Sequence, residues 1–164
     1  MASGSDSRAG GAPARTRARP IGRGQLPSRA FAAGRQVRFG DCDPAGIVYT
    51  PRFVDRLCCA VEDFFLAQGL DYHGLIRGGL GLGYARVECE FFRPGFMGDD
   101  LTYTVIVERI GCASAEFTIH AHRDQDEVMR GNLVMVATSL ATHRAEPLPP
   151  AMRSILTTYQ DLCR

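Results

Sequence analysis

Residues 37–68 limit what this chain can fold into more than any other stretch. They read V-R-F-G-D-C-D-P-A-G-I-V-Y-T-P-R-F-V-D-R-L-C-C-A-V-E-D-F-F-L-A-Q. Pro44 fixes its own φ and disfavours helical geometry for the residue before it, so Asp43 is expected to be extended at a turn. The pattern therefore predicts a short strand that starts at Val37, a turn over residues 43–46, and a long helix after the turn.

The predicted helix is amphipathic and begins near Pro51, whose missing N–H costs nothing in a first helical turn. Beyond this point, apolar residues recur at helical spacing on one face, and charged residues fall mostly on the other. The apolar positions are Phe53, Leu57, Val61 and Phe64, with Val54, Cys58 and Phe65 beside them. Such a helix packs one face against a core, and its N-terminus favours nearby negative charge.

Asp43 is the candidate catalytic carboxylate, because it precedes a helix end whose free N–H groups can stabilise an oxyanion. A carboxylate in this position can act as a nucleophile or as a general base. Two other interpretations stay open. An Asp ahead of a helix is often only a cap, and Asp41 is a competing carboxylate two residues earlier.

The rest of the chain predicts an α+β domain with an antiparallel sheet. Four strand-like segments lie at about Leu82–Phe92, Leu101–Ile110, Ala115–Arg123 and Val128–His143, and Met152–Leu162 is predicted to be a helix. The last strand is long, so a bend or bulge is expected near Gly131. Residues 1–36 are rich in Gly, Ala, Arg, Ser and Pro, and are expected to be disordered, as a dispensable extension or a transit peptide.

The thirteen residues F-G-D-C-D-P-A-G-I-V-Y-T-P, at positions 39–51, resemble the signature of the 4-hydroxybenzoyl-CoA thioesterase family of hotdog-fold proteins. The order of predicted strands extends the resemblance, more weakly, over roughly residues 37–164. The resemblance implies a hotdog domain in this range, an antiparallel sheet wrapped around a long central helix. It also implies an acyl-CoA thioesterase that needs no cofactor and works as a homodimer or homotetramer with shared active sites.

The resemblance assigns roles within the motif. The second Asp of D-C-D-P is the family's catalytic carboxylate, so Asp43 is expected to attack the thioester carbonyl or to activate water. The backbone N–H of Thr50 is expected to polarise that carbonyl. Tyr49 is a candidate for the acyl pocket, with ordinary packing as the alternative, and Gly46 is expected to let the backbone approach the substrate. Thr50 replaces an aromatic residue of the best-known branch, so the acyl group stays open, with an aromatic one expected first.

CoA carries phosphates that family members bind with basic residues. The turn at residues 109–114 lacks the basic cluster of the corresponding turn in the closest branch, which leaves Arg109, Arg123 and Arg144 as candidates. Two alternatives follow. The substrate could be an acyl-carrier-protein thioester, which the depleted turn favours mildly, or the protein could bind acyl-CoA without turning it over.

Other polar residues carry weaker signals. Glu62 lies on the predicted central helix, where some hotdog branches keep a catalytic carboxylate, but it is interpreted as a solvent or interface charge. His73 follows the helix in a loop that could approach the pocket. His120 and His122 share a strand face, but no third ligand has a helpful spacing, so we expect a surface pair and no metal.

Charge and cysteine usage exclude several classes of protein. Residues 1–36 hold seven Arg and one acidic residue, whereas residues 37–164 hold twelve Arg and seventeen acidic residues. The second part is mildly acidic, which argues against nucleic-acid binding. The chain has no Lys, which excludes a Walker-type phosphate loop. The six cysteines have no zinc spacing, and no apolar run approaches a membrane span, so a reduced cytoplasmic protein without membrane association is expected.

Overall fold

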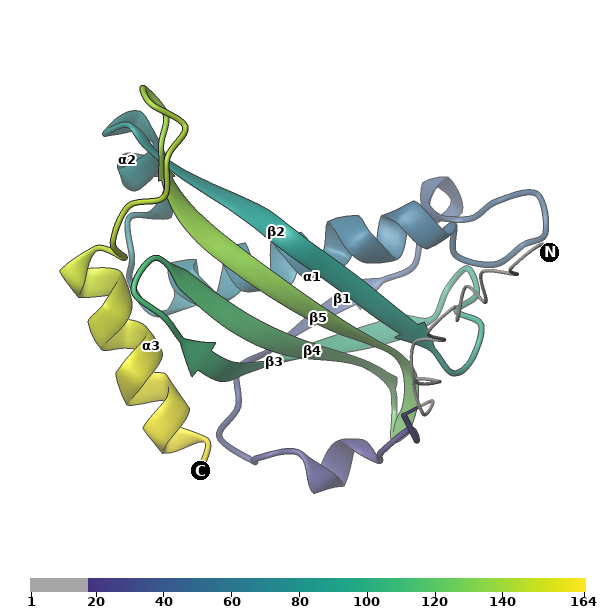
Figure 1. The fold of residues 1–164 in the computed structure, drawn as a ribbon. Helices are drawn as coiled ribbons and strands as arrows, with labels where there is room; N and C mark the ends of the chain where they lie inside the picture. Colours follow the sequence, from purple (N-terminus) through teal and green to yellow (C-terminus); the bar gives the residue numbers. More distant parts are fainter. Residues whose placement is uncertain (1–17) are drawn as a thin grey trace, which may run out of the picture.

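The structure is a computed structural model that describes residues 18–164, and what was expected for residues 1–17 lies outside this range. In chain order the described elements are η1 (Arg23–Gln25), β1 (Ala32–Gln36), η2 (Phe39–Asp41), α1 (Thr50–Ala67), α2 (Tyr72–Arg77), β2 (Leu80–Phe91), β3 (Asp100–Ile110), β4 (Ser114–Arg123), β5 (Asp126–Ser139) and α3 (Pro150–Leu162). The five strands form one antiparallel sheet in the order β1-β3-β4-β5-β2. Figure 1 shows the long helix α1 lying behind this curved sheet, which is the predicted α+β arrangement.

The core lies between α1 and the inner face of the sheet. Phe53, Leu57, Val61, Phe64 and Phe65 are all buried on one side of α1, as the helical spacing predicted. Fully burying each such side chain contributes roughly 1.5–3 kcal/mol. The sheet supplies alternating positions of β3, β4 and β5, namely Leu101, Tyr103, Val105, Val107, Ala115, Phe117, Ile119, Ala121, Met129, Leu133, Met135 and Ala137.

Gly131 on β5 lies against Leu57 of α1, with no room for a side chain. A Cβ at this position would lie 2.3 Å from Cδ1 of Leu57. Pairing runs without a break through Gly131, which faces Cys89 on β2 and Ile119 on β4. The bulge expected near Gly131 is present in β5 at Val128, because β5 passes from Met129 to Glu127 while β4 passes only from Ala121 to His122. Gly131 itself is paired normally on both sides and makes room for the helix.

Residues 18–36 are part of the fold, so the expectation of disorder up to residue 36 is wrong for them. The first strand is Ala32–Gln36, paired with β3, and not a strand that starts at Val37. This strand has no large apolar residue to indicate it in the sequence, but its backbone hydrogen bonds to the edge of the sheet do not depend on side chains. Just ahead of it, the N–H of Phe31 donates to the hydroxyl of Tyr159 on α3 at 2.7 Å.

The segment from residue 18 to 26 covers the outer face of β4 and β5. The N–H of Ile21 donates to Oε2 of Glu127 at 2.8 Å, and Nε2 of His122 lies 3.0 Å from the carbonyl oxygen of Ile21. His120 and His122 are consequently buried, and the expectation that they form a surface pair is wrong. Within residues 18–164 no group of three or more potential ligands is arranged to hold a metal.

The remaining elements follow the sequence closely. The α2 helix is capped by Asp71, whose side chain accepts from the N–H of Gly74, and α3 begins two residues before the predicted Met152. The last strand ends at Ser139, four residues before the predicted His143. All six cysteines lie in the described part and are unpaired. Among the described helices, none has the length and apolar character that crossing a membrane requires.

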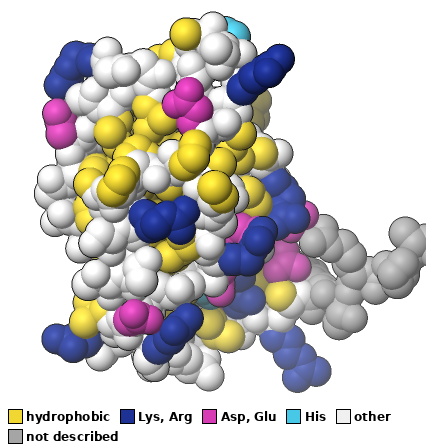
Figure 2. Space-filling view, turned by 60° about the vertical axis from the view of Figure 1, so that its left-hand side comes forward, with side chains coloured by type: hydrophobic (Ala, Val, Ile, Leu, Met, Phe, Trp, Pro, Cys, Tyr) yellow, Lys and Arg dark blue, Asp and Glu magenta, His cyan; other side chains and the backbone are white. Residues whose placement is uncertain are grey.

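The surface carries apolar side chains as well as charges. In the view of Figure 2, hydrophobic side chains gather in the middle of one face, with basic and acidic side chains around them. Among the large hydrophobic residues of the described range 18–164, Phe39 and Met97 have the largest exposed fractions, 85% and 61%. Both residues lie next to the turn at residues 43–46, because they line the same cavity as Asp43.

Candidate active site

Residues 41–49 form a tight hairpin that carries the candidate catalytic carboxylate. The N–H of Tyr49 donates to the carbonyl oxygen of Asp41 at 2.8 Å, and the N–H of Asp43 donates to that of Ile47 at 2.9 Å. The N–H of Gly46 closes the turn on the carbonyl of Asp43 at 2.9 Å. Gly46 has φ +78, a left-handed conformation that glycine adopts without strain and that ends this kind of turn.

The Asp43 side chain is half-buried at the tip of this hairpin. Its Oδ1 accepts the N–H of Ala45 at 2.8 Å, which fixes the orientation of the carboxylate. Within the described part of the chain, Oδ2 has no hydrogen-bond partner. One oxygen therefore holds the group in place, and the other is available for chemistry.

Asp41 has very different surroundings. It is 8% exposed, its Oδ2 accepts the N–H of Arg38 at 2.9 Å, and Arg56 donates to Oδ1 and Oδ2 at 3.1 and 3.4 Å. Burial raises the pKa of Asp41, but the N–H of Arg38 and the Arg56 guanidinium outweigh it and hold the pKa below the ordinary value. Asp41 is an ionised carboxylate committed to these donors, so it is a poorer candidate for the reacting group than Asp43.

Helix α1 begins directly after the hairpin. Tyr49 is its N-cap, and Pro51 has no N–H to offer. The N–H of Arg52 donates to the carbonyl oxygen of Tyr49 at 2.8 Å. The N–H of Thr50, by contrast, has no hydrogen-bond acceptor within residues 18–164. The positive end of the helix therefore presents the Thr50 N–H as an unused donor, as an oxyanion site needs.

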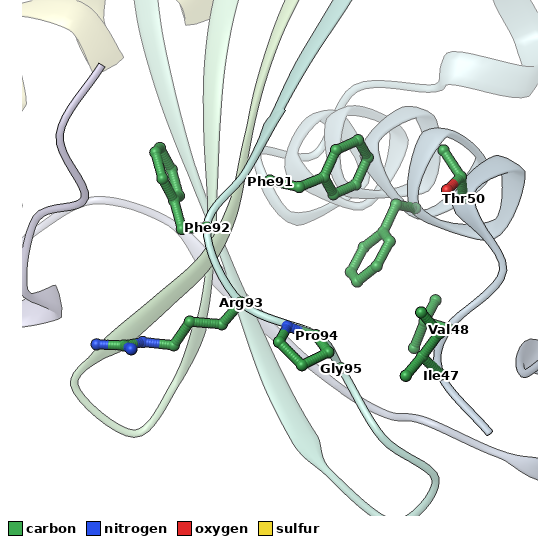
Figure 3. A pocket seen from close by; sticks show the side chains of 9 residues that line it. Ile47, Val48, Thr50, Phe91, Phe92, Arg93, Pro94 and Gly95 are labelled. Atoms are coloured by element: carbon green, nitrogen blue, oxygen red, sulfur yellow. The ribbon is translucent and has the colours of Figure 1, made fainter. Parts of the chain in front are cut away.

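Two cavities flank the hairpin. The first, of about 330 Å³, is lined by Ile47, Val48, Thr50, Phe53, Phe91, Phe92, Arg93, Pro94 and Gly95. Figure 3 shows Phe91 and Thr50 facing each other across it, while the side chains of Phe92 and Arg93 point away. The second, of about 540 Å³, is lined by Phe39, Gly40, Cys42, Asp43, Pro44, Gly46 and Met97.

The structure places the predicted site residues on both sides of the hairpin. Asp43 and Gly46 line the larger cavity, and Thr50 lines the smaller one. Tyr49 is exposed and lines neither of the two. A single chain therefore brings the carboxylate and the helix end into neighbouring cavities and not into one.

The three arginines predicted to bind CoA lie outside both cavities. Nε of Arg109 donates to Glu116 at 3.1 Å, and Nη1 of Arg123 donates to Asp99 at 2.7 Å. Arg144 is exposed, and the described residues offer its side chain no hydrogen-bond or ion-pair partner. Two of the three guanidinium groups thus already have carboxylate partners.

Glu62 and His73 form a pair that the sequence did not indicate. Nε2 of His73 lies 2.8 Å from Oε1 of Glu62, and both side chains are partly exposed. Neither residue lines the cavities beside the hairpin. The pair links α1 to α2 at a distance from Asp43.

Sequence reasoning missed the apolar walls of both cavities. Phe91 ends β2, Met97 lies in the loop before β3, and Phe39 lies in η2, so no local pattern joins them. The only sequence signal in this region is the run Phe91-Phe92-Arg93-Pro94-Gly95, whose pattern indicates the end of a strand. In the fold, residues 91–95 form the wall of the smaller cavity that faces the N-terminus of α1.

Comparison with known proteins identifies the family. A family model described as the thioesterase-like superfamily matches residues 37–156. The chain belongs to this superfamily. The prediction of a thioester hydrolase made from the thirteen-residue motif is thereby confirmed.

Relatives within the thioesterase-like superfamily have named activities. A 1,4-dihydroxy-2-naphthoyl-CoA hydrolase of Synechococcus sp. (strain WH7803) is 29% identical over 129 residues, which cover 72% of this chain and 82% of the relative. A 4-hydroxybenzoyl-CoA thioesterase of Pseudomonas sp. (strain CBS-3) is 40% identical over 43 residues, which cover 26% of this chain and 30% of the relative.

Solved structures confirm the hotdog fold. The crystal structure of a 1,4-dihydroxy-2-naphthoyl-CoA thioesterase from Synechocystis aligns with a TM-score of 0.70 at 23% identity, covering 78% of this chain and 96% of that one. The PA5185 protein of Pseudomonas aeruginosa aligns with a TM-score of 0.77 at 20% identity, covering 87% and 97%. At such identities the likeness concerns the fold alone.

Proposed function

We propose that this protein is an acyl-CoA thioesterase that hydrolyses an aromatic acyl-CoA to the free acid and CoA. Two groups at the same hairpin support the proposal. Asp43 has one carboxylate oxygen without a partner in the described part of the chain, and Thr50 has an unused N–H at the start of α1. The first supplies a nucleophile or base, and the second supplies an oxyanion donor.

In the reaction, the Thr50 N–H donates to the thioester oxygen as negative charge develops on it. Asp43 either removes a proton from the attacking water or attacks the carbonyl carbon itself, giving an anhydride that water then cleaves. In both routes the C–S bond breaks, the electron pair leaves with sulfur, and the thiolate takes up a proton. The CoA thiolate is a good leaving group, so no cofactor is required.

In this proposal Asp43 and Thr50 of one chain act together, and a second copy of the chain supplies the remaining walls of the site. Asp43 and Thr50 line different cavities of one chain, and both cavities open to the surface. The β2 strand lies at the edge of the sheet, and Val87 on it is exposed. An edge strand with exposed apolar side chains is suited to pairing with another chain. We therefore expect a homodimer or homotetramer.

The aromatic acyl group is supported by the cavity walls. Phe53 and Phe91 line the cavity at the helix N-terminus, with ring centroids 5.6 Å apart, and Phe39 lines the cavity at Asp43. Tilted aromatic rings of this kind pack well against another ring. The named relatives act on naphthoyl and hydroxybenzoyl thioesters, which supports the same class.

An acyl-carrier-protein thioester is the second candidate. It is favoured by the pairing of Arg109 with Glu116 and of Arg123 with Asp99, which leaves these groups less able to bind nucleotide phosphates. Arg109, Arg123 and Arg144 stay candidates for the CoA phosphates, and Gly46 and Tyr49 for the acyl chain. A cytoplasmic location, expected from the sequence, belongs to the same proposal.

Free-thiol release from a panel of thioesters tests the function. The panel contains benzoyl, hydroxybenzoyl, naphthoyl and short aliphatic CoA esters, and the matching acyl-carrier-protein esters. We expect an aryl-CoA ester to be turned over fastest. Faster turnover of carrier-protein esters would select the second candidate, and no turnover of any thioester would contradict both.

A further inference from the structure

We propose that Asp41 is a positioning residue, which acts with Arg56 to fix the Asp43 carboxylate relative to the Thr50 N–H. This inference rests on the proposed function. The Asp41–Arg56 ion pair joins the base of the hairpin to the second turn of α1, so it connects the two elements that carry the reacting groups.

Asp41 makes contacts at both ends of the hairpin. Its carboxylate accepts the N–H of Arg38, and its own N–H donates back to the Arg38 carbonyl, both at 2.9 Å. Its carbonyl oxygen accepts the N–H of Tyr49 at 2.8 Å. Since Tyr49 is the N-cap of α1, one residue holds the incoming chain, the outgoing chain and the start of the helix.

Arg56 completes this arrangement from the helix. It donates to both carboxylate oxygens of Asp41, at 3.1 and 3.4 Å, across 15 positions of sequence. The side chain of Asp41 is 11% exposed and that of Arg56 is 28% exposed. Leaving a charge that is this well shielded from water without an ion-pair partner would destabilise the folded state, so Asp41 and Arg56 hold each other in place.

The geometry of the reaction depends on this contact. Asp43 follows Asp41 by two residues and Thr50 follows Tyr49 by one, so a shift at Asp41 moves the carboxylate and the oxyanion donor relative to each other. Misplacing a reacting group by 1 Å can cost about 10²-fold in rate. Asp41 itself does not line either cavity beside the hairpin, which fits a role through other residues.

The chain offers a matched control. Arg35 on β1 and Asp63 on α1 form a second Asp–Arg pair that ties a neighbouring element to the same helix. Asp63 lies two turns further along α1, and neither residue contacts the hairpin in the described hydrogen-bond network. Asp63→Asn therefore removes an ion pair of the same chemistry without releasing Asp43.

Steady-state kinetics of Asp41→Asn, Arg56→Met, the double variant, Arg56→Lys and Asp63→Asn test the inference. We expect Asp41→Asn and Arg56→Met each to lower kcat by about 10- to 100-fold, with KM changed less than about threefold. The double variant should be no slower than the slower single variant, because both changes remove one interaction. Arg56→Lys should recover part of the loss, and Asp63→Asn should stay within about twofold of wild type.

A second readout is independent of turnover. Hydrogen exchange of the Asp43, Gly46 and Tyr49 amides reports whether the hairpin hydrogen bonds open. We expect these amides to exchange at least about tenfold faster in Asp41→Asn and Arg56→Met, and at the wild-type rate in Asp63→Asn. If Asp41→Asn does not fold, the two Arg56 variants carry both measurements.

Additive losses in the double variant, a change confined to KM, or unchanged exchange of the hairpin amides would overturn the inference. A wild-type protein with no thioesterase activity would overturn the proposed function instead, while the exchange experiment would still decide whether the ion pair holds the hairpin. Full loss of activity in Asp41→Asn with Asp43→Asn active would make Asp41 the reacting carboxylate, and so contradict both.

Discussion

Asp41 and Asp43 lie two residues apart on one hairpin, yet their carboxylates have opposite surroundings. Asp41 is buried and accepts hydrogen bonds from the Arg38 N–H and the Arg56 guanidinium. Asp43 is half-buried, accepts one N–H, from Ala45, and lines a cavity of about 540 Å³. The motif alone makes both residues candidates for the reacting carboxylate. Their hydrogen-bond partners indicate that Asp41 has a structural role and that Asp43 is the group available to react.

Replacing Gly131 with Ala should destabilise the protein, because the new methyl group would overlap Leu57 of α1. Overpacking of a dense core costs typically about 1–3 kcal/mol. Urea unfolding at neutral pH measures the change in the free energy of unfolding. Gly83→Ala is the matched control in β2, since no atom lies within 4 Å of a Cβ built there. Equal stability of the two variants would show that α1 does not approach the sheet at Gly131.

Shortening the chain tests where the domain begins. A protein that starts at Ala18 keeps every contact described for residues 18–36, whereas one that starts at Val37 loses β1 and the Ile21 N–H bond to Glu127. Each buried polar group left without its partner costs about 1–3 kcal/mol. We expect the shorter protein to unfold at a clearly lower temperature or to lack a cooperative transition. Identical thermal unfolding of the two proteins would place the boundary at residue 37 after all.

The stability of the fold should fall on acidification. Burial lowers the pKa of His120 below its ordinary 6.5, although the hydrogen bond to Glu127 opposes the shift. As pH falls below 6.5, the unfolded chain binds a proton that the folded chain does not bind, so the free energy of unfolding decreases until the folded pKa is passed. Burial raises the pKa of Glu127, but Arg130, Ile21 and His120 outweigh it and lower the net value, so further stability is lost below 4.5.

Denaturant unfolding between pH 7.5 and pH 4 measures this dependence. We expect His120→Gln to have a flatter pH profile than wild type just below pH 6.5, because the neutral amide cannot take up the proton. His143→Asn is the control, since His143 is exposed and its φ of +56 is a conformation that Asn tolerates. A profile of His120→Gln that parallels wild type would contradict the account of the buried histidine.

Local signals in the sequence were enough to predict the turn at residues 43–46 and the long helix. Pro44 and Pro51 set the turn and the helix start through their own backbone geometry, and the spacing of Phe53 and Leu57 marked the buried face. These features depend on neighbours within a few positions.

What the sequence could not supply are contacts between distant positions. The β1 strand contains no large apolar residue and is recognisable only through its pairing with β3. Arg56 meets Asp41 across 15 positions, and Ile21 meets Glu127 across 106. The burial of His120 follows from that last contact, so an error about residues 18–36 led to an error about the histidines. The cavity walls at residues 91–97 were missed for the same reason.

The most direct test of the central claim is free-thiol release from an aryl-CoA ester by wild type and Asp43→Asn. Asn keeps an oxygen that can accept the Ala45 N–H, so the hairpin should stay intact while the nucleophile or base is lost. We predict that kcat falls by roughly 10²–10⁴-fold, with unchanged unfolding temperature and with Asp63→Asn active as the folded control. Turnover by Asp43→Asn within about tenfold of wild type would contradict the assignment of Asp43 as the reacting carboxylate.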